Sequence, residues 1–190
     1  ILRPTSKAFS EDVLRLLRGF QFSARFSMIA ADELKAIALE LSKEYHTLPV
    51  ERIWEEWKKW GLKGVNYSAS LEYLTDTGLH TLYPEISNLI GLEQDSTWHP
   101  EGPVNLHTGF VLDHIHQVCK RENITGDDRL VMIFSALCHD FGKAVCTERK
   151  FSEKYGREVI TSLQHEKLGG PIARKFLESI GCPVKIIDRV

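Results

Sequence analysis

The sequence predicts an all-α fold. Over most of the 190 residues, apolar side chains recur three and four positions apart, which is the spacing of one face of an α-helix. Glycine and proline residues separate these segments, as is usual where helices begin and end. They become frequent between residues 79 and 103, which predicts a joint between two helical units. The expected architecture is therefore a helical unit over residues 1–98 followed by a helical bundle over residues 99–190.

The first unit is expected to contain four helices. Their predicted ranges are residues 11–25, 31–45, 49–64 and 68–77. Ser10 precedes the first helix and is a suitable N-cap, because its hydroxyl can accept a hydrogen bond from a free amide of the first turn. Pro49 opens the third helix and Gly78 stops the fourth. The apolar residues in the first three ranges each form one stripe, so these helices are expected to bury a single face.

The second unit is expected to contain three longer helices, over residues 105–120, 127–141 and 164–180. Gly142 is the predicted C-cap of the second. The polar residues 143–162 predict a long loop, in which residues 159–161 are the candidate for a short extended piece. The expected inward-facing residues of the last helix are Leu168, Ile172, Phe176 and Leu177. The chain has no initiator Met and its last six residues resemble the first turns of a helix, which together predict a trimmed chain.

The composition excludes several classes of protein. With 43% apolar and 26% charged residues, the chain resembles an ordinary soluble globular protein. It has no apolar run near the roughly 20 residues of a membrane span and no signal peptide, so we expect a cytoplasmic protein with no membrane partner. The net charge of −2 excludes a protein-wide basic surface for nucleic acid. The four cysteines form no CxxC pair and are expected to be reduced thiols.

The most informative segment is the adjacent pair His139-Asp140 at the end of an apolar helical run. His107 and His165 each lie at the start of a predicted helix. Neighbouring residues of a helix point about 100° apart, so His139 and Asp140 can reach one ion only at a helix end. Imidazole and carboxylate together suit a divalent ion with open positions, whereas a structural zinc site would more often recruit cysteines. His107, His139, Asp140 and His165 are therefore the predicted metal ligands.

Lys143 follows this pair closely. A lysine in a loop is usually a solvated charge, but beside a divalent ion it can bind a phosphate dianion. A divalent ion also lowers the pKa of a bound water and neutralises charge that builds on a phosphoryl oxygen. These residue types predict metal-assisted phosphoester hydrolysis, with His139, Asp140 and Lys143 as catalytic residues. The alternative is that the histidines are ordinary core or surface residues, which is how we interpret His114 and His116.

The EDxxR sequence at residues 11–15 has two interpretations. A capped amphipathic helix with acids in its first turn and a Glu11–Arg15 pair explains it without any function. In the functional interpretation, Asp12 and Arg15 share an edge of the helix, where a carboxylate acceptor and a guanidinium donor can pair with a nucleobase. The first 25 residues also carry a local excess of basic side chains. These are Arg3, Lys7, Arg15, Arg18 and Arg25.

Three segments resemble a known family. Residues 98–108 (WHPEGPVNLHT), 136–143 (ALCHDFGK) and 165–171 (HEKLGGP) are similar to the HD domain fused to bacterial tRNA nucleotidyltransferases, the CCA-adding enzymes. That domain belongs to the HD superfamily of metal-dependent phosphohydrolases. The EDxxR sequence and the following Arg- and Phe-rich helix resemble the neck of class II nucleotidyltransferases of the CCA-adding and poly(A) polymerase type. The resemblance covers essentially the whole chain.

The resemblance implies a neck and body over residues 1–98 and an HD domain, truncated at its C-terminus, over residues 99–190. It implies phosphatase and 2′,3′-cyclic phosphodiesterase activity on nucleotide-like phosphoesters, supported by nickel, magnesium or manganese. It also implies that Asp12 and Arg15 select a nucleotide with support from Glu11 and Arg18. Transfer RNA would be a partner through the parent enzyme.

The chain departs from the family pattern in three ways. The catalytic head of the nucleotidyltransferase is not in residues 1–190, so nucleotidyl transfer by this chain alone is not expected. A further ligand from a later helix is missing, because Asp188 lies too early to serve. The loop over residues 145–162 is longer and more charged than expected. Two alternatives stay open: a non-catalytic nucleotide- and tRNA-binding module whose HD unit is structural or mediates homodimerisation, and a helical scaffold with incidental histidines.

Overall fold

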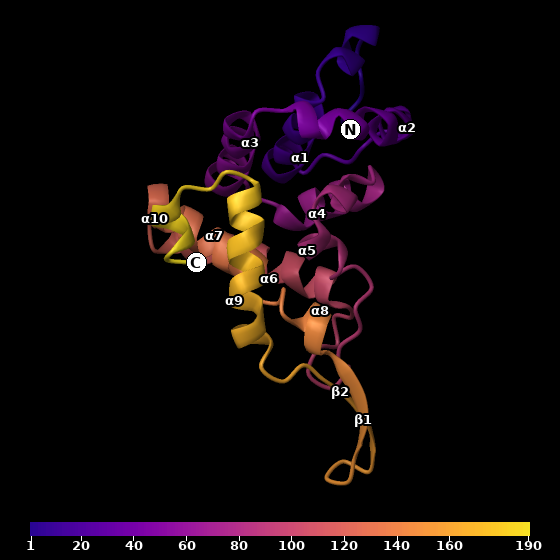
Figure 1. The fold of residues 1–190 in the computed structure, drawn as a ribbon, viewed down its shortest axis with the longest axis vertical. Coiled ribbons are helices and arrows are strands. Elements are labelled where there is room, and N and C mark those ends of the chain that lie inside the picture. Colours follow the sequence, from indigo (N-terminus) through magenta and orange to yellow (C-terminus); the bar gives the residue numbers. More distant parts are fainter.

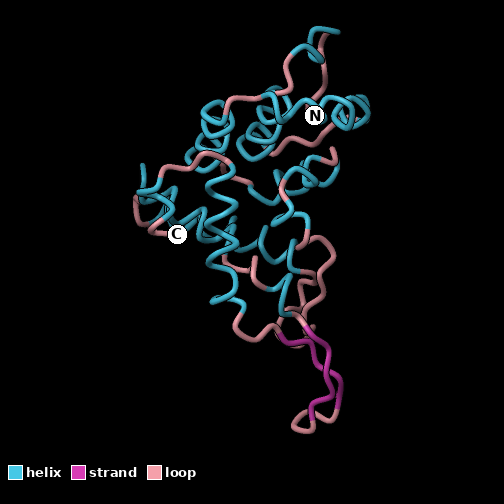
Figure 2. The backbone as a smooth tube through the Cα atoms, viewed as in Figure 1, coloured by secondary structure: helices cyan, strands magenta, loops and turns pink.

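The structure is a computed structural model that describes the backbone of residues 1–190 and the side chains of residues 1–6 and 9–190. The described chain is helical apart from one antiparallel hairpin (Figure 2), which confirms the predicted all-α fold. The first four α-helices lie at one end of an elongated molecule and the hairpin projects from the other (Figure 1). Among the described residues, no helix has both the length and the apolar character that crossing a bilayer requires.

The first half of the chain forms the four predicted helices with shifted ends. They are α1 (Leu14–Phe26), α2 (Asp32–Leu41), α3 (Val50–Lys63) and α4 (Tyr67–Asp76). Short 3-10 helices precede α1 and follow α2 and α4, over Lys7–Glu11, Ser42–Thr47 and Leu79–Leu82. The predicted N-cap at Ser10 is wrong. Asp12 takes that role, because its Oδ1 accepts a hydrogen bond from the Leu14 amide at 2.9 Å and so starts α1 three residues later than expected.

The second half contains the three predicted long helices and several shorter elements. The helices are α5 (Pro84–Ser87), α6 (Val104–Arg121), α7 (Gly126–Cys138), α8 (Lys143–Cys146), α9 (His165–Ser179) and α10 (Val184–Ile187). The α7 helix ends three residues earlier than predicted, and residues 139–142 form a turn. On α9, Phe176 and Leu177 are buried as expected, but Leu168 is exposed, so its predicted inward position is wrong.

The segment predicted as a long loop forms a hairpin after α8. Strand β1 (Glu148–Ser152) pairs with β2 (Arg157–Thr161), and Gly156 occupies the left-handed region in the turn between them. The extended piece predicted at residues 159–161 is confirmed as part of β2. Arg157 fixes the hairpin to the loop before α6, because its guanidinium donates two hydrogen bonds to Asp95 at 2.8 and 2.9 Å. β1 is exposed except for the half-buried Ser152, and Val159 is the one buried residue of β2, so no apolar alternation marked the strands in the sequence.

One aromatic core joins the two halves of the chain. Trp57 and Trp60 of α3 are fully buried and contact Phe134 of α7, with ring centroids 6.3 and 5.8 Å apart. Trp57 also contacts Phe176 of α9 edge to face at 5.4 Å. This core contains residues from both sides of the boundary predicted between residues 98 and 99. It therefore holds the helices of the predicted first unit directly against those of the second. The division into two domains at that point stays a prediction.

A buried arginine strengthens the same junction. Arg129 of α7 donates hydrogen bonds to the backbone carbonyls of Gly61 and Gly64 at 3.0 and 2.8 Å, and to the Tyr67 hydroxyl at 3.1 Å. It also donates to Nδ1 of His116 at 3.0 Å, which requires an unprotonated acceptor on that ring. A single side chain therefore bridges α3, α4, α6 and α7.

Candidate metal centre

Side chains from three segments meet around the carboxylate of Asp140. His107 lies in the first turn of α6, His139 and Asp140 lie in the turn after α7, and His165 begins α9. The Nε2 atoms of His139, His165 and His107 lie 3.2, 3.5 and 3.9 Å from the nearest Asp140 carboxylate oxygen. The structure thus brings together all four residues predicted as metal ligands.

Two glycines allow α9 to approach the turn that carries Asp140. A Cβ atom at Gly142 would overlap the carbonyl oxygen of His165 and come within 2.7 Å of the Gly169 amide nitrogen. The predicted C-cap of α7 at Gly142 is wrong, because α7 ends at Cys138 with His139 as its C-cap and Gly142 has a right-handed φ of −67°. The turn needs glycine there for space, and this close contact is what brings His165 to Asp140.

The three imidazole rings are held in one tautomer. His139 and His165 each donate from Nδ1 to the backbone carbonyl three residues earlier, both at 2.8 Å. His107 donates from Nδ1 to the Glu101 carboxylate at 2.6 Å. Because these oxygens can only accept, each neutral ring carries its proton on Nδ1 and a lone pair on Nε2. Histidines that bind a metal through Nε2 are usually oriented in this way.

Asp140 is buried and has an unsatisfied oxygen. Its Oδ2 accepts no hydrogen bond from any residue that the structure describes, although Lys143 Nζ forms an ion pair with it at 2.8 Å. The Lys143 ammonium donates instead to the side-chain oxygen of Gln94 at 2.6 Å. The Nε2 atoms of His139 and His107 face Oδ2 of Asp140, and that of His165 faces the other oxygen, Oδ1. A buried, incompletely satisfied carboxylate with three imidazole nitrogens around it is what a divalent cation would satisfy. The residues present therefore fit a metal ion.

The charge state of the group also favours a cation. Burial raises the pKa of Asp140, but the close approach of His139 and of the Lys143 ammonium outweighs it and lowers the pKa to about 2. Burial lowers the pKa of His107, which favours the neutral ring that a metal needs. Burial also lowers the pKa of His139, but the Asp140 carboxylate outweighs burial there, so the pKa of His139 is raised above its usual value. A cation would therefore compete with a proton at His139.

A cavity of about 210 Å³ adjoins this group. Lys143 and His165 line it, and so do Ile160 of β2 and Ser162, the residue after that strand. His99 and the 67% exposed Trp98 close it from the loop before α6. Because Lys143 and His165 belong to both the cavity and the Asp140 group, a phosphoester in the cavity would lie next to the predicted metal ligands.

Sequence reasoning did not assign His99, Glu101 or Gln94 to the site. All three lie in the loop before α6, and Glu101 is six residues from His107 across Gly102 and Pro103. The available signal for Glu101 was its position: it is a carboxylate just before α6, the helix whose first turn carries His107. Asp188, which the sequence places too early to be a further ligand, accepts a hydrogen bond from Arg174 at 2.6 Å.

The carboxylate of the EDxxR sequence is engaged by its own fold. Asp12 Oδ1 caps α1, and Oδ2 accepts a hydrogen bond from Arg52 of α3 at 3.1 Å. Glu11 is exposed at the end of the preceding 3-10 helix. The predicted pairing of Asp12 with a nucleobase would therefore have to compete with Arg52.

Basic side chains within and around the EDxxR sequence line a second cavity, of about 420 Å³. Arg15 and Arg18 lie in its wall together with Arg3 and Phe22. The guanidinium of Arg18 is 5.9 Å from the centre of the Phe22 ring. Lys7 is another basic residue of this region, but its side chain lies outside the described side chains. The structure therefore places the basic part of the predicted nucleotide site at a cavity.

Comparison with known proteins identifies relatives over nearly the whole chain. The chain is 34% identical over 189 residues to a multifunctional CCA protein of Tolumonas auensis, which covers 96% of this chain and 42% of the relative. It is 33% identical over 194 residues to the proteins of the same name from Pasteurella multocida and Shewanella frigidimarina, covering 99% of this chain and 43% of each relative. No family model matches the chain. It spans about two fifths of the length of these relatives. The chain therefore belongs to the family of the multifunctional CCA proteins and fits the C-terminal part of such an enzyme.

Proposed function

We propose that residues 99–190 form a metal-dependent phosphohydrolase unit of the HD type, within a tRNA nucleotidyltransferase that adds or repairs the 3′ CCA end. The observation that carries the proposal is the buried Asp140 carboxylate with three Nε2 atoms within 3.9 Å of it. His107, His139, Asp140 and His165 would hold a divalent ion such as nickel, magnesium or manganese. Phosphatase or 2′,3′-cyclic phosphodiesterase activity would follow, with a nucleotide-like phosphoester as substrate.

The roles of the residues follow from their chemistry. A bound divalent ion supplies a water of lowered pKa and neutralises charge on a phosphoryl oxygen. The three histidines present lone pairs because their Nδ1 protons are already engaged. Lys143 contributes a positive charge at the boundary between the ligand group and the cavity, where it can bind a phosphoryl oxygen once it leaves Gln94. The cavity wall formed by the hairpin would limit the access of water to the bound ester.

The N-terminal cavity supports a second binding function. Arg3, Arg15 and Arg18 around one hollow favour a polyanion, and Phe22 offers an aromatic face to a base. We propose that residues 1–98, the neck and body, bind nucleotide and tRNA in the parent enzyme. Arg15 and Arg18 would contact the nucleotide there, and Asp12 and Glu11 would complete the site if Asp12 exchanges its contact with Arg52.

Hydrolysis with added metal tests the phosphohydrolase proposal. Phosphate release from a chromogenic phosphoester should appear with Ni²⁺ or Mn²⁺ and disappear with chelator. His139→Ala and Asp140→Ala should abolish it, because each removes a ligand. His114→Ala is the matched control, since His114 is exposed on the same helix as His107 and lies outside the ligand group.

Thermal melting distinguishes the alternatives, because an ion bound to the native state raises the melting temperature. Stabilisation by metal that His139→Ala removes, without any hydrolysis, would favour a non-catalytic unit with a structural or dimerising role. The absence of stabilisation by any divalent ion would mean that the histidines are incidental.

A further inference from the structure

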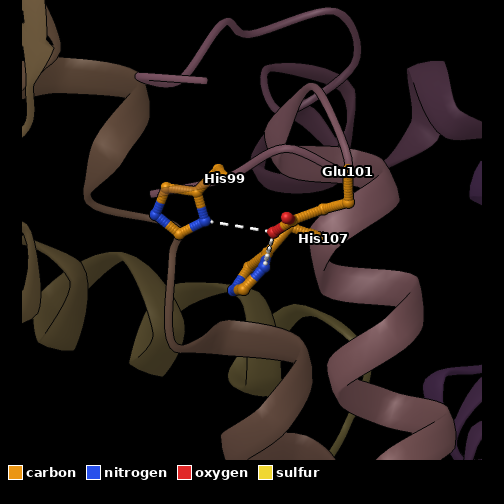
Figure 3. Close-up of side chains that lie close together, drawn as sticks. All are labelled: His99, Glu101 and His107. Carbon is orange, nitrogen blue, oxygen red and sulfur yellow. Dashed lines mark hydrogen bonds and ion pairs between the residues drawn. The ribbon is translucent and has the colours of Figure 1, made fainter. Parts of the chain in front are cut away.

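A second group of side chains lies on the outer side of His107. Glu101 accepts hydrogen bonds from Nδ1 of His107 at 2.6 Å and from Nδ1 of His99 at 3.1 Å, both on the same oxygen, Oε1. The two rings meet edge to face with centroids 4.8 Å apart. Figure 3 shows both rings turned toward the end of the Glu101 side chain. One carboxylate therefore engages two imidazoles.

The backbone explains why Glu101 can reach both rings. Gly102 has a φ of 107°, a conformation that favours glycine, and its amide donates to the carbonyl of His99 at 3.2 Å. This turn brings His99 and Glu101 together immediately before Pro103, the N-cap of α6. His107 then lies one turn into α6, next to the carboxylate.

Two interpretations of this group have different geometric requirements. His99, Glu101 and His107 are residue types that could themselves hold a metal ion. Ligands of one ion each lie about 2 Å from it, so their donor atoms are usually 3 Å or more apart. The 2.6 Å separation of Nδ1 and Oε1 is instead that of a charge-assisted hydrogen bond. The hydrogen-bonded interpretation is favoured.

Because Glu101 engages Nδ1 of both rings, the Nε2 atom of each ring stays available for another partner. Nε2 of His107 faces Asp140 at 3.9 Å, whereas His99 lines the cavity beside Lys143 and His165. We propose that Glu101 is a positioning residue that fixes both imidazoles, so that His107 binds the metal ion and His99 contacts a phosphoester in the adjoining cavity. This proposal rests on the proposed function. It adds a division of labour between two histidines that share one carboxylate.

Metal binding measured without turnover tests the part played by Glu101. Calorimetric titration with Ni²⁺ should show an affinity about 10–100-fold weaker for Glu101→Ala than for the unaltered chain, as for other residues that orient metal-binding histidines. Glu101→Gln keeps one acceptor oxygen and should recover part of the loss. Glu122→Ala, at an exposed carboxylate after α6, should bind Ni²⁺ like the unaltered chain. Unchanged Ni²⁺ affinity in Glu101→Ala would overturn the proposal.

The split between binding and turnover tests the part played by His99. His99→Ala should leave Ni²⁺ affinity unchanged and raise KM for the phosphoester, whereas His107→Ala should lose Ni²⁺ binding. If His99→Ala weakened Ni²⁺ binding as much as His107→Ala, the second group would be a metal site and the proposal would be wrong. If the unaltered chain bound no metal, the proposed function itself would fail. If it bound metal but His99→Ala changed neither KM nor kcat, only the role of His99 would fail.

Discussion

Replacement of the buried Arg129 should destabilise the junction between the two halves of the chain. Its guanidinium makes four hydrogen bonds, to two backbone carbonyls, the Tyr67 hydroxyl and the His116 ring. Hydrogen bonds to a charged group contribute about 1.5–3 kcal/mol each, but burial of the charge offsets much of that sum. Tyr67 also continues to donate to the Gly61 carbonyl at 2.8 Å, which limits the loss there. We expect Arg129→Met to lower the free energy of unfolding by about 3 kcal/mol.

Urea unfolding followed by tryptophan fluorescence measures this change. Trp57 and Trp60 of α3 are buried beside Phe134, which lies on α7 together with Arg129. Their emission therefore reports the core that the substitution affects. For a chain of this size the melting temperature should fall by about 6–12 °C. Arg121→Met is the control, because Arg121 is 71% exposed and its pair with Glu122 contributes at most about 1 kcal/mol. A loss below 1 kcal/mol for Arg129→Met would refute the argument that this side chain joins the helices.

Two further changes test the fold around the sites. Gly142→Ala should both destabilise the protein and weaken Ni²⁺ binding, because its methyl group would push the start of α9, with His165, away from the turn. Thermal melting measures the first effect and calorimetric titration the second. A Ni²⁺ affinity equal to that of the unaltered chain would contradict this reasoning. The second change concerns pH. Burial, followed by the charge of Arg129, lowers the pKa of His116, so the unfolded chain binds a proton more readily and stability falls as pH drops below about 6.5. His116→Asn, whose side-chain oxygen can still accept from Arg129, should flatten that fall in urea unfolding between pH 7.5 and 5; an unchanged slope would exclude His116 as its source.

Helix type and position were predictable because they depend on local patterns. The stripe of Leu16, Leu17, Phe20 and Ala24 predicts one buried face of a helix, and all four side chains are buried. The three-residue error at the start of α1 arose because Ser10 and Asp12 are both good capping residues. The backbone, not the composition, decides which of them meets a free amide. Only the extended piece at residues 159–161 of the hairpin was predicted, because β1 is exposed and charged and Val159 is the one buried residue of β2.

The four candidate metal ligands were predictable from the sequence, but the side chains that hydrogen-bond to them or to Lys143 were not. A His-Asp pair at a helix end, with histidines at the starts of two other helices, indicated the group by residue chemistry and spacing. Glu101 and Gln94 reach it only because the loop before α6 folds back on the turn after α7. The sequence also suggested one role for Gly142, that of a helix C-cap, whereas its lack of a side chain is what the packing of α9 requires.

By itself, the sequence determined the all-α class, the long helices and the three histidines that meet at Asp140, because helical periodicity and ligand chemistry can be read from the residues themselves. Tertiary structure decided that Nε2 of each histidine faces the Asp140 carboxylate and that Glu101 accepts hydrogen bonds from two rings. It also decided that Asp12 pairs with Arg52. These depend on distances between segments that lie far apart in the chain. Only packing sets such distances, since side-chain type fixes what a group can bind but not what lies within its reach.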